Sequence, residues 1–247
     1  MFFRAVRDED KFHRLLEFAR VLPRIRARVG RDLARHALPR EKVLATVVRL
    51  LESTLVRIGN EKYARENHSY GLTTLRDQHV KVRGTQICFH FRGKSGKVHA
   101  LCIDDARLAR IVKRCQDLPG QELFQYIDET GQRHSVSSHD VNAYLHEITG
   151  AEFTAKDFRT WAATVAAARI LRDAAPCPSR RSARAAVAAC MRAVAERLGN
   201  TPTVCRKSYV HPAVLQSYEC GQLARLARRL ADASLVVLLL RAARSAS

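Results

Sequence analysis

Tyr209 is the residue whose surroundings point most clearly to chemistry. It follows the cations Arg206 and Lys207 in the run from Thr201 to Pro212. A phenol ordinarily has a pKa of about 10, and nearby cations stabilise the phenolate, so such a tyrosine can be a nucleophile near neutral pH. A phenolate is also a better leaving group than an alkoxide, so a bond from Tyr209 to phosphorus would stay reversible. The pattern therefore predicts a tyrosine nucleophile for a phosphodiester.

Cleaving a phosphodiester without a metal also requires donors for the nonbridging oxygens and an acid for the leaving oxygen. Lys94 could approach a phosphate because it stands in the glycine-rich run 92–97, although such a run is also typical of an ordinary exposed hairpin. It is not a nucleotide-binding loop, because the GxxxxGK[ST] spacing is missing and the turn joins two strands. We therefore do not expect ATP binding.

The N-terminal third should be helical. Apolar residues recur at helical spacing from Asp8 to about His36, with a break at Pro23, which predicts two short helices or one kinked helix. The stretch 41–58 has a continuous apolar stripe and is followed by Gly59 in the usual position for a helix stop. This places Arg57 in the last turn of a buried helix.

Between residues 79 and 103 the apolar period changes to two, which is typical of strands. We expect strands near 80–82, 87–91 and 98–103 in a small antiparallel sheet, with Lys94 at the tip of the last hairpin. The sequence then returns to helices, and Tyr209 should lie between a helix that stops at Gly199 and one that begins near Pro212. The expected later helices cover 104–115, 138–148, 155–171, 182–198, 212–219 and 222–243.

These elements predict an α+β fold that is mainly helical. We expect one catalytic domain over 1–247, with a helical part at 1–75, the sheet and its lysine hairpin at 76–103, and a helical part carrying the tyrosine at 104–247. Phe158 and Trp161 should belong to the core, and His211 suits a helix entry or a DNA contact.

Charge favours a polyanionic partner. Lys and Arg number 43 against 24 Asp and Glu, for a net charge of +19, and a compact surface with this excess is strongly self-repulsive. Nucleic acid is the leading candidate; an acidic membrane surface and a merely soluble basic protein are the alternatives. The longest apolar run, 235–240, is too short to cross a bilayer, so we expect a soluble intracellular protein.

The seven cysteines are odd in number and lack the CxxC spacing of zinc or redox sites. We interpret them as reduced cytosolic thiols that mostly serve as small apolar core residues, and we expect no metal site.

Several separated motifs, in one order, resemble the small type IB DNA topoisomerases of bacteria and poxviruses. They lie at 57–63, 67–75, 91–97, 156–161 and 199–212. The resemblance implies the catalytic fold shared by tyrosine recombinases and type IB topoisomerases. It also implies an enzyme that relaxes supercoiled DNA through a 3′-phosphotyrosyl intermediate, without ATP, Mg²⁺ or another cofactor.

The resemblance also assigns roles. Tyr209 matches the nucleophile, and Arg57 and Arg159 match the two arginines that bind the nonbridging oxygens. Lys94 matches the hairpin lysine that protonates the leaving 5′ oxygen, with Lys156 as a possible auxiliary. Asn200 stands where poxvirus and larger eukaryotic relatives have histidine, which implies an amide donor and no proton transfer. Residues expected to contact DNA are Lys62, Tyr63, Thr73, Arg92, Lys97, Arg206 and Lys207.

The same resemblance leads us to expect double-stranded DNA as the partner, a monomer, no membrane association, and a place in the bacterial cytoplasm with the nucleoid. One departure is that family members begin with a small β-rich clamp domain, whereas this chain starts near the junction at Arg7. We therefore expect weak, strongly salt-dependent DNA binding.

Two alternatives remain. A tyrosine recombinase shares the Arg, Lys, Arg, Tyr set but has histidine three residues before the second arginine, where this chain has Lys156. A noncatalytic DNA-binding module would explain the charge, but it has no need of a complete reactive set.

Overall fold

The computed structural model describes residues 2–174, 179–223 and 232–245, and the chain divides into two compact units. The first unit joins Met1–Val21 to Asp157–Ser247, and the second is Leu22–Lys156. Helix α1 (Phe2–Leu33) continues through Pro23 as a single helix, which decides against two separate helices in this region.

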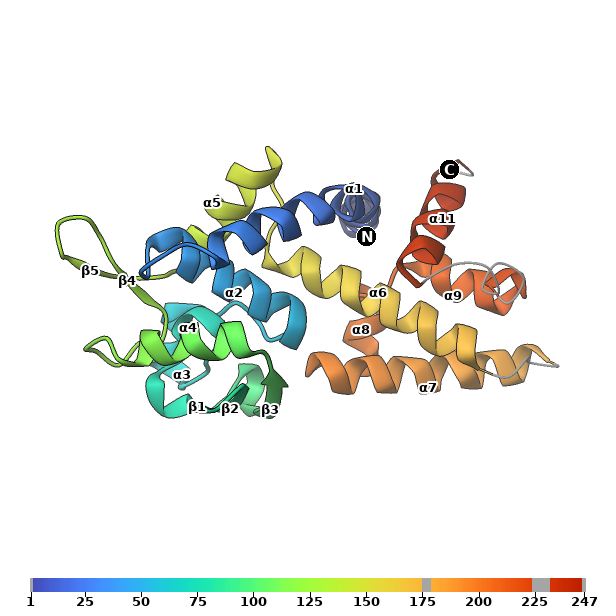
Figure 1. The fold of residues 1–247 in the computed structure, drawn as a ribbon. Coiled ribbons are helices and arrows are strands. Elements are labelled where there is room, and N and C mark those ends of the chain that lie inside the picture. Colours follow the sequence, from blue (N-terminus) through green and yellow to red (C-terminus); the bar gives the residue numbers. More distant parts are fainter. Residues whose placement is uncertain (1, 175–178, 224–231, 246–247) are drawn as a thin grey trace. The chain divides into compact units, whose positions relative to one another are not determined.

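The second unit holds the small sheet (Figure 1). Its elements are α2 (Arg40–Thr54), α3 (Glu61–Asn67), η1 (Leu72–Thr74), η2 (Asp77–His79), β1 (Val80–Arg83), β2 (Gln86–Arg92), η3 (Lys94–Gly96), β3 (Val98–Asp104), α4 (Ala106–Gln116), β4 (Gln125–Ile127), β5 (Arg133–Ser135) and α5 (Ser138–Thr149). Strands β1, β2 and β3 are antiparallel and adjacent in that order, as predicted. The two short strands β4 and β5 were not predicted.

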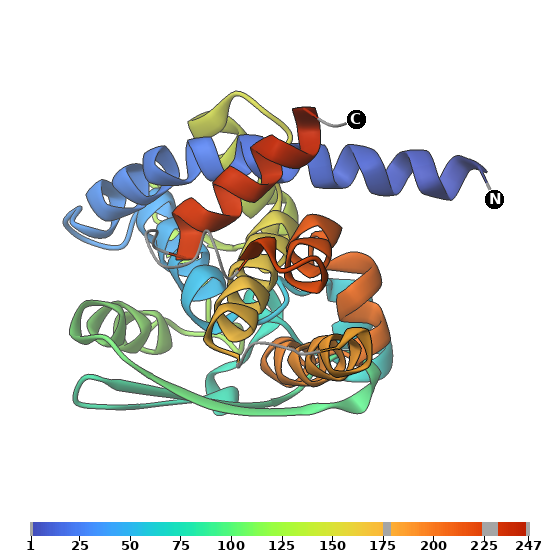
Figure 2. The same ribbon diagram turned by 90° about the vertical axis from the view of Figure 1, so that its right-hand side faces the viewer.

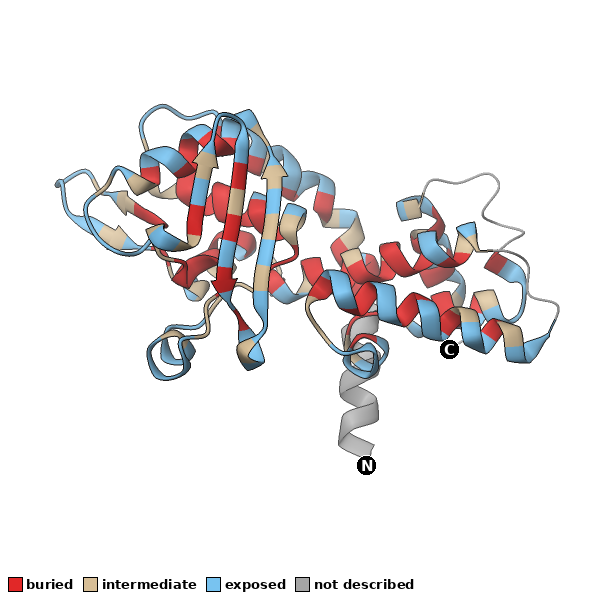
Figure 3. Cartoon of the chain, turned by 90° about the horizontal axis from the view of Figure 1, so that it is seen from below, coloured by how far each residue is buried: buried red, intermediate tan, exposed pale blue. Residues whose placement is uncertain are grey.

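The buried face of the middle strand β2 explains how the sheet packs against the helices. Ile87, Phe89 and Phe91 are buried on one face of β2, because alternate side chains of a strand point to the same side. Helices α2 and α4 contact the sheet, and Figure 3 shows buried and exposed residues alternating along the middle strand. The edge strand β3 differs, because none of its residues is buried.

Helix α2 ends earlier than its apolar stripe predicts. Leu55 closes it in the left-handed conformation, with φ 56° and its N–H donating to the Leu51 carbonyl. The Leu55 side chain is only 2% exposed, so burial offsets the cost of that backbone conformation. The prediction that the helix reaches Ile58 and stops at Gly59 is wrong, and Arg57 does not lie in its last turn. Arg57 belongs to the non-helical segment that follows.

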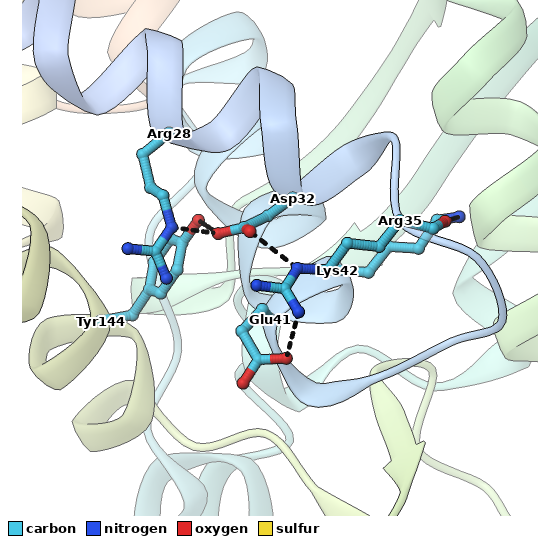
Figure 4. Close-up of polar contacts among 6 residues, drawn as sticks. All are labelled: Arg28, Asp32, Arg35, Glu41, Lys42 and Tyr144. Carbon is cyan, nitrogen blue, oxygen red and sulfur yellow. Dashed lines mark hydrogen bonds and ion pairs between the residues drawn. The ribbon is translucent and has the colours of Figure 1, made fainter.

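An ionic cluster around a buried carboxylate joins the end of α1 to α5 (Figure 4). Asp32 is 2% exposed and accepts three hydrogen bonds. The donors are Arg28 Nε at 2.7 Å, Arg35 Nε at 2.9 Å and the Tyr144 hydroxyl at 2.7 Å. Burial by itself would raise the pKa of Asp32, but these bonds outweigh it and hold the pKa below the ordinary value. Asp32 is therefore a fully engaged carboxylate at a helix junction.

The first unit is helical in its described part. Its further elements are α6 (Ala155–Asp173), α7 (Arg180–Leu198), α8 (Pro202–Ser208), α9 (Pro212–Glu219) and α11 (Asp232–Ser245). Helices α6 and α7 lie side by side in Figures 1 and 2, and buried alanines such as Ala163 and Ala167 allow this close approach. The thiol of Cys190 on α7 points to the Ala167 carbonyl at 3.8 Å.

The later predicted helices are confirmed with boundary shifts of a few residues, and Phe158 and Trp161 are buried as predicted. The helix predicted over 222–243 lies partly outside the described residues, and α11 covers its second half. Among the described residues, no helix combines the length and the apolar character that crossing a membrane requires.

The prediction that the cysteines are all reduced is wrong for one pair. Cys88 and Cys102 form a disulfide between β2 and β3. The register places them directly opposite each other, which sequence spacing could not reveal. Cys115, Cys190 and Cys205 are thiols and are buried as predicted, whereas Cys220 is an exposed thiol. Cys177 lies outside the described residues.

Candidate active site

The Arg57 segment is held by backbone hydrogen bonds to a second segment. The N–H of Leu72 donates to the Arg57 carbonyl at 2.9 Å, and the N–H of Thr73 donates to the Ile58 carbonyl at 2.7 Å. The Thr73 hydroxyl donates to the same Ile58 carbonyl at 3.0 Å. These bonds fix the backbone on which Arg57 stands, although the two segments are about 15 residues apart in sequence.

Gly71 is essential to this pairing because the two backbones touch there. A Cβ atom on Gly71 would lie 2.5 Å from the Gly59 nitrogen and 2.6 Å from the Arg57 carbonyl oxygen. These atoms are backbone, so no side-chain rotation could relieve the overlap. Gly59 itself has a φ of 109°, a conformation that favours glycine. Two glycines therefore let the Arg57 segment pack against η1.

The lysine hairpin is fastened to the same second segment. The N–H of Tyr70 donates to the Arg92 carbonyl at 2.8 Å, and the Ser69 hydroxyl donates to the Gly93 carbonyl at 3.3 Å. Residues 69–73 thus contact the backbone beside Arg57 at one end and the backbone beside Lys94 at the other. We call residues 69–73 the brace.

Lys94 begins the short helical turn η3 at the hairpin tip, as predicted, and its side chain is exposed. The turn is closed by Gly93 N–H donating to the Lys97 carbonyl at 2.7 Å. Ser95 and Gly96 have positive φ values of 61° and 73°, which reverse the chain sharply.

A row of aromatic rings supports the base of this hairpin. Phe91 stacks on His99 with ring centroids 4.9 Å apart, and His79 lies 4.4 Å from Tyr70 of the brace. The Nδ1 atom of His79 accepts the Arg76 N–H at 3.0 Å. Burial, and then the charge of Arg76, lower the pKa of His79. His79 is therefore held as the neutral, accepting form.

In the first unit, Arg159 and Tyr209 lie together. The Arg159 guanidinium carbon is 5.3 Å from the centroid of the Tyr209 ring, a cation–π contact. The two residues are only 3% and 7% exposed, so the contact is largely shielded from water. Arg159 Nη2 also donates to the Leu198 carbonyl at 2.7 Å, which ties α6 to the end of α7. A permanent cation therefore lies against the face of the candidate nucleophile.

Thr164 holds the backbone on both sides of Val210, directly after Tyr209. Its buried hydroxyl donates toward the Tyr209 carbonyl at 3.1 Å and accepts the His211 N–H at 3.2 Å. The single hydroxyl proton is shared between the Tyr209 carbonyl and the Thr160 carbonyl, one turn earlier on α6, at 2.8 Å. His211 caps α9 through its Nδ1 atom, which accepts the Ala213 N–H at 3.0 Å. The helix-entry interpretation of His211 is thus confirmed, and its DNA contact stays a prediction.

Asn200 and Lys156 occupy helix ends near these residues in sequence. Asn200 follows Gly199, which closes α7 with a φ of 65°, and its N–H donates to the Ala195 carbonyl at 2.9 Å. Lys156 is exposed in the first turn of α6, three residues before Arg159. Arg159, Asn200 and Tyr209 thus belong to the first unit. Arg57 and Lys94 belong to the second unit.

The expected DNA contacts are mostly exposed. They are Lys62 and Tyr63 on α3, Arg92 and Lys97 beside the hairpin tip, and Arg206 and Lys207 on α8. Thr73 differs, because it is 6% exposed and its hydroxyl donates to the Ile58 carbonyl. Thr73 therefore supports the Arg57 backbone here, and its contact with DNA stays a prediction.

Sequence reasoning missed Thr164 and the brace as positioning elements. The Gly71 to Leu75 run was visible as a motif, but nothing local showed that Gly71 touches Gly59. Thr164 is one of several small residues along α6, so its sequence carries no distinguishing signal. The described ranges contain no group of three or more His, Cys, Asp or Glu side chains placed to hold a metal ion.

Comparison with known proteins identifies the family. Residues 2–233 match the sequence profile described as eukaryotic DNA topoisomerase I, catalytic core. A protein named DNA topoisomerase 1B from Acanthamoeba polyphaga mimivirus is 33% identical over 220 residues, covering 86% of this chain and 65% of that protein. The DNA topoisomerase 1B of vaccinia virus strain Copenhagen is 21% identical over 199 residues, covering 79% of this chain and 60% of that protein.

The chain belongs to the family of the DNA topoisomerase I catalytic core. The predicted resemblance and the predicted mainly helical fold with a small antiparallel sheet are thereby confirmed. The chain spans somewhat less than two thirds of the length of the relatives described above.

Proposed function

We propose that this chain relaxes supercoiled double-stranded DNA by transient cleavage and religation of one strand. Tyr209 attacks the phosphodiester, the 3′ end becomes bound to its oxygen, and the 5′-hydroxyl strand is released to rotate. The returning 5′ hydroxyl then expels the tyrosine. The bond energy is kept in the phosphotyrosine, so the cycle requires neither ATP nor Mg²⁺ as a cofactor.

The remaining roles follow from the chemistry of each side chain. Arg57 and Arg159 bind the nonbridging oxygens and stabilise the charge of the transition state. Lys94 protonates the leaving 5′ oxygen, with Lys156 as auxiliary, and the Asn200 amide donates to a nonbridging oxygen. The five principal residues must gather around one phosphate when DNA is bound. They are Tyr209, Arg57, Lys94, Arg159 and Asn200.

The observation that carries the proposal is the Arg159 guanidinium over the Tyr209 ring at 5.3 Å, in a chain of this family. A buried cation beside a phenol stabilises the phenolate, which is the form that attacks phosphorus. The brace supports the proposal independently, because it links the backbones beside Arg57 and Lys94 through hydrogen bonds at 2.9 and 2.8 Å.

The partner in this proposal is duplex DNA, bound by a monomer mainly through phosphates, to which the +19 charge is suited. We expect the site of action to be chromosomal DNA in the cytoplasm, without membrane association. A tyrosine recombinase is the less favoured alternative, because the relatives described above are named topoisomerases.

The test is relaxation of supercoiled plasmid in EDTA without ATP, with detergent added to trap the covalent adduct. The wild-type chain should relax the plasmid and become linked to a 3′ end, whereas Tyr209→Phe should do neither. Relaxation by Tyr209→Phe would disprove the nucleophile assignment. Joining of strands from two different duplexes would instead favour the recombinase.

A salt series tests the binding mode. Each phosphate contact releases counterions, so the logarithm of the affinity should fall steeply and linearly with the logarithm of salt concentration. Tight binding that hardly changes with salt concentration would contradict binding mainly through electrostatic contacts with phosphates.

A further inference from the structure

The Cys88–Cys102 disulfide lies on the outer face of the sheet. Cys88 is opposite Cys102 on one side and Lys81 on the other, so the three side chains form one row. The Cα atoms of the two cysteines are 4.1 Å apart. Cys102 is exposed and Cys88 is partly exposed, whereas the neighbouring Phe89 is buried on the opposite face. A solvent-borne thiol can therefore reach the bond.

The disulfide closes the hairpin that carries Lys94. The two cysteines are 14 residues apart, and Lys94 lies between them. Strand β3 has no fully buried residue, so apolar burial holds it less firmly than it holds β2, where Ile87, Phe89 and Phe91 are buried. Its attachment depends largely on backbone hydrogen bonds, on the Phe91–His99 ring contact and on this covalent bond. An edge strand with exposed backbone bonds opens readily.

The charges around the disulfide favour exchange with an anionic thiol. By the alternation of the strands, Lys81, Arg83, His90 and Arg92 share its face, and all four are exposed or partly exposed. Asp104 is the acidic residue of this face in the three strands. Nearby cations stabilise a leaving thiolate and attract an anionic reductant.

We propose that Cys88–Cys102 is a thiol–disulfide exchange site whose co-substrate is a small anionic thiol such as glutathione. An external thiolate attacks the exposed Cys102 sulfur, a mixed disulfide forms, and Cys88 leaves as a thiolate. A second external thiolate then attacks the external sulfur of the mixed disulfide and releases Cys102. In sum, the protein disulfide gains two electrons and two protons, and two external thiols become one disulfide.

The functional consequence rests on the proposed function. The oxidised hairpin holds Lys94 in position, whereas the reduced hairpin samples open states, so protonation of the leaving oxygen becomes slower. Misplacement of a reacting group by about 1 Å can reduce a rate by on the order of 100-fold. Intermittent misplacement should have a smaller effect, and we expect cleavage to slow by about tenfold.

The experiment poises the full chain in buffers of reduced and oxidised glutathione. Differential alkylation followed by peptide mass spectrometry measures the redox state of Cys88 and Cys102. Hydrogen exchange measures the opening of residues 89–101, with α2 as the internal reference. Single-turnover cleavage, with detergent trapping, measures the effect on catalysis. The variants are Cys88→Ser/Cys102→Ser and, as the matched control, Cys220→Ser, which removes an exposed free thiol.

In the oxidised wild type, both cysteines should resist alkylation. Reduction should speed exchange within 89–101 by at least about tenfold, leave α2 unchanged and slow cleavage. The double variant should behave like the reduced protein in both buffers, and Cys220→Ser should behave like the wild type. Lys81→Gln should slow exchange with glutathione more than exchange with 2-mercaptoethanol, because both attack as thiolates but glutathione carries additional negative charge.

Three results would overturn the proposal. These are alkylation of both cysteines under oxidising conditions, equal hydrogen exchange of 89–101 in both redox states, and equal cleavage rates of oxidised and reduced protein. Thermal unfolding of the double variant separates loss of fold from loss of the disulfide. If Tyr209 forms no adduct in either state, the proposed function fails, whereas the alkylation and exchange measurements still decide whether the disulfide forms and closes the hairpin.

Discussion

Replacing Gly71 with alanine should damage the proposed site without touching any charged residue. The Gly71 backbone has φ −149° and ψ −179°, which any residue can adopt, so the effect is purely steric. The new methyl carbon would lie 2.5 Å from the Gly59 nitrogen, whereas ordinary contact begins near 3.4 Å. The Arg57 segment and the brace must therefore separate by roughly 1 Å.

The magnitude follows from what this separation breaks. Two backbone hydrogen bonds hold the segments together, Leu72 N–H to the Arg57 carbonyl at 2.9 Å and Thr73 N–H to the Ile58 carbonyl at 2.7 Å. Each contributes about 1 kcal/mol, and overpacking costs about 1–3 kcal/mol. We expect the free energy of unfolding to fall by about 3–5 kcal/mol. Displacement of Arg57 by roughly 1 Å should slow cleavage by on the order of 100-fold.

Urea unfolding gives the stability change, and single-turnover cleavage with detergent trapping gives the rate. Gly30→Ala is the matched control, because no heavy atom lies within 4 Å of its added Cβ on helix α1. This control should gain about 0.5–1 kcal/mol of stability and cleave normally. If Gly71→Ala cleaved within about threefold of the wild type while remaining folded, the brace would not position Arg57.

Three other perturbations test the remaining structural arguments. Thr164→Val removes the hydroxyl that holds the Tyr209 carbonyl at 3.1 Å. It should lower the cleavage rate and cost about 1–3 kcal/mol of stability, while DNA affinity stays constant. An unchanged cleavage rate would exclude a positioning role for Thr164. Asp32→Asn should destabilise by about 1.5–3 kcal/mol, because it removes a buried carboxylate that accepts three hydrogen bonds. Tyr144→Phe should cost only about 1 kcal/mol, and equal losses in urea unfolding would contradict this ranking. Because the folded-state pKa of His79 lies below its ordinary value of 6.5, its contribution to stability is full above about pH 6.5 and is lost as the pH falls through the folded pKa. His79→Asn should flatten that part of the stability profile, and an identical pH profile would show that another group titrates.

Local patterns in the sequence were sufficient to predict many of the helices and strands. The alternation of Ile87, Phe89 and Phe91 predicted the middle strand and its buried face, and both are observed. Gly199 predicted the end of α7, where it adopts a positive φ of 65°. Pro212 predicted the start of α9. These features depend on residues within a few positions of one another, so they can be predicted from the sequence alone.

The candidate residues were also named from the sequence, but their surroundings were not. The cation–π contact of Arg159 with Tyr209 joins residues 50 positions apart, and the brace joins Arg57 to residues about 15 positions later. Whether all five principal residues gather on one phosphate stays a prediction. The sequence supplied the chemical types, because motifs preserve them, whereas distances and burial depend on packing.

Only the tertiary structure decided the features that involve competing or distant partners. The apolar stripe of α2 continues beyond Thr54, yet the helix ends there, because Leu55 is buried in a left-handed conformation and the Arg57 segment pairs with the brace. The disulfide likewise required the register that places Cys88 opposite Cys102. Helix periodicity and cysteine spacing report only on residues that are close in sequence. The end of α2 and the disulfide are instead decided by contacts between residues that are distant in sequence and close in space.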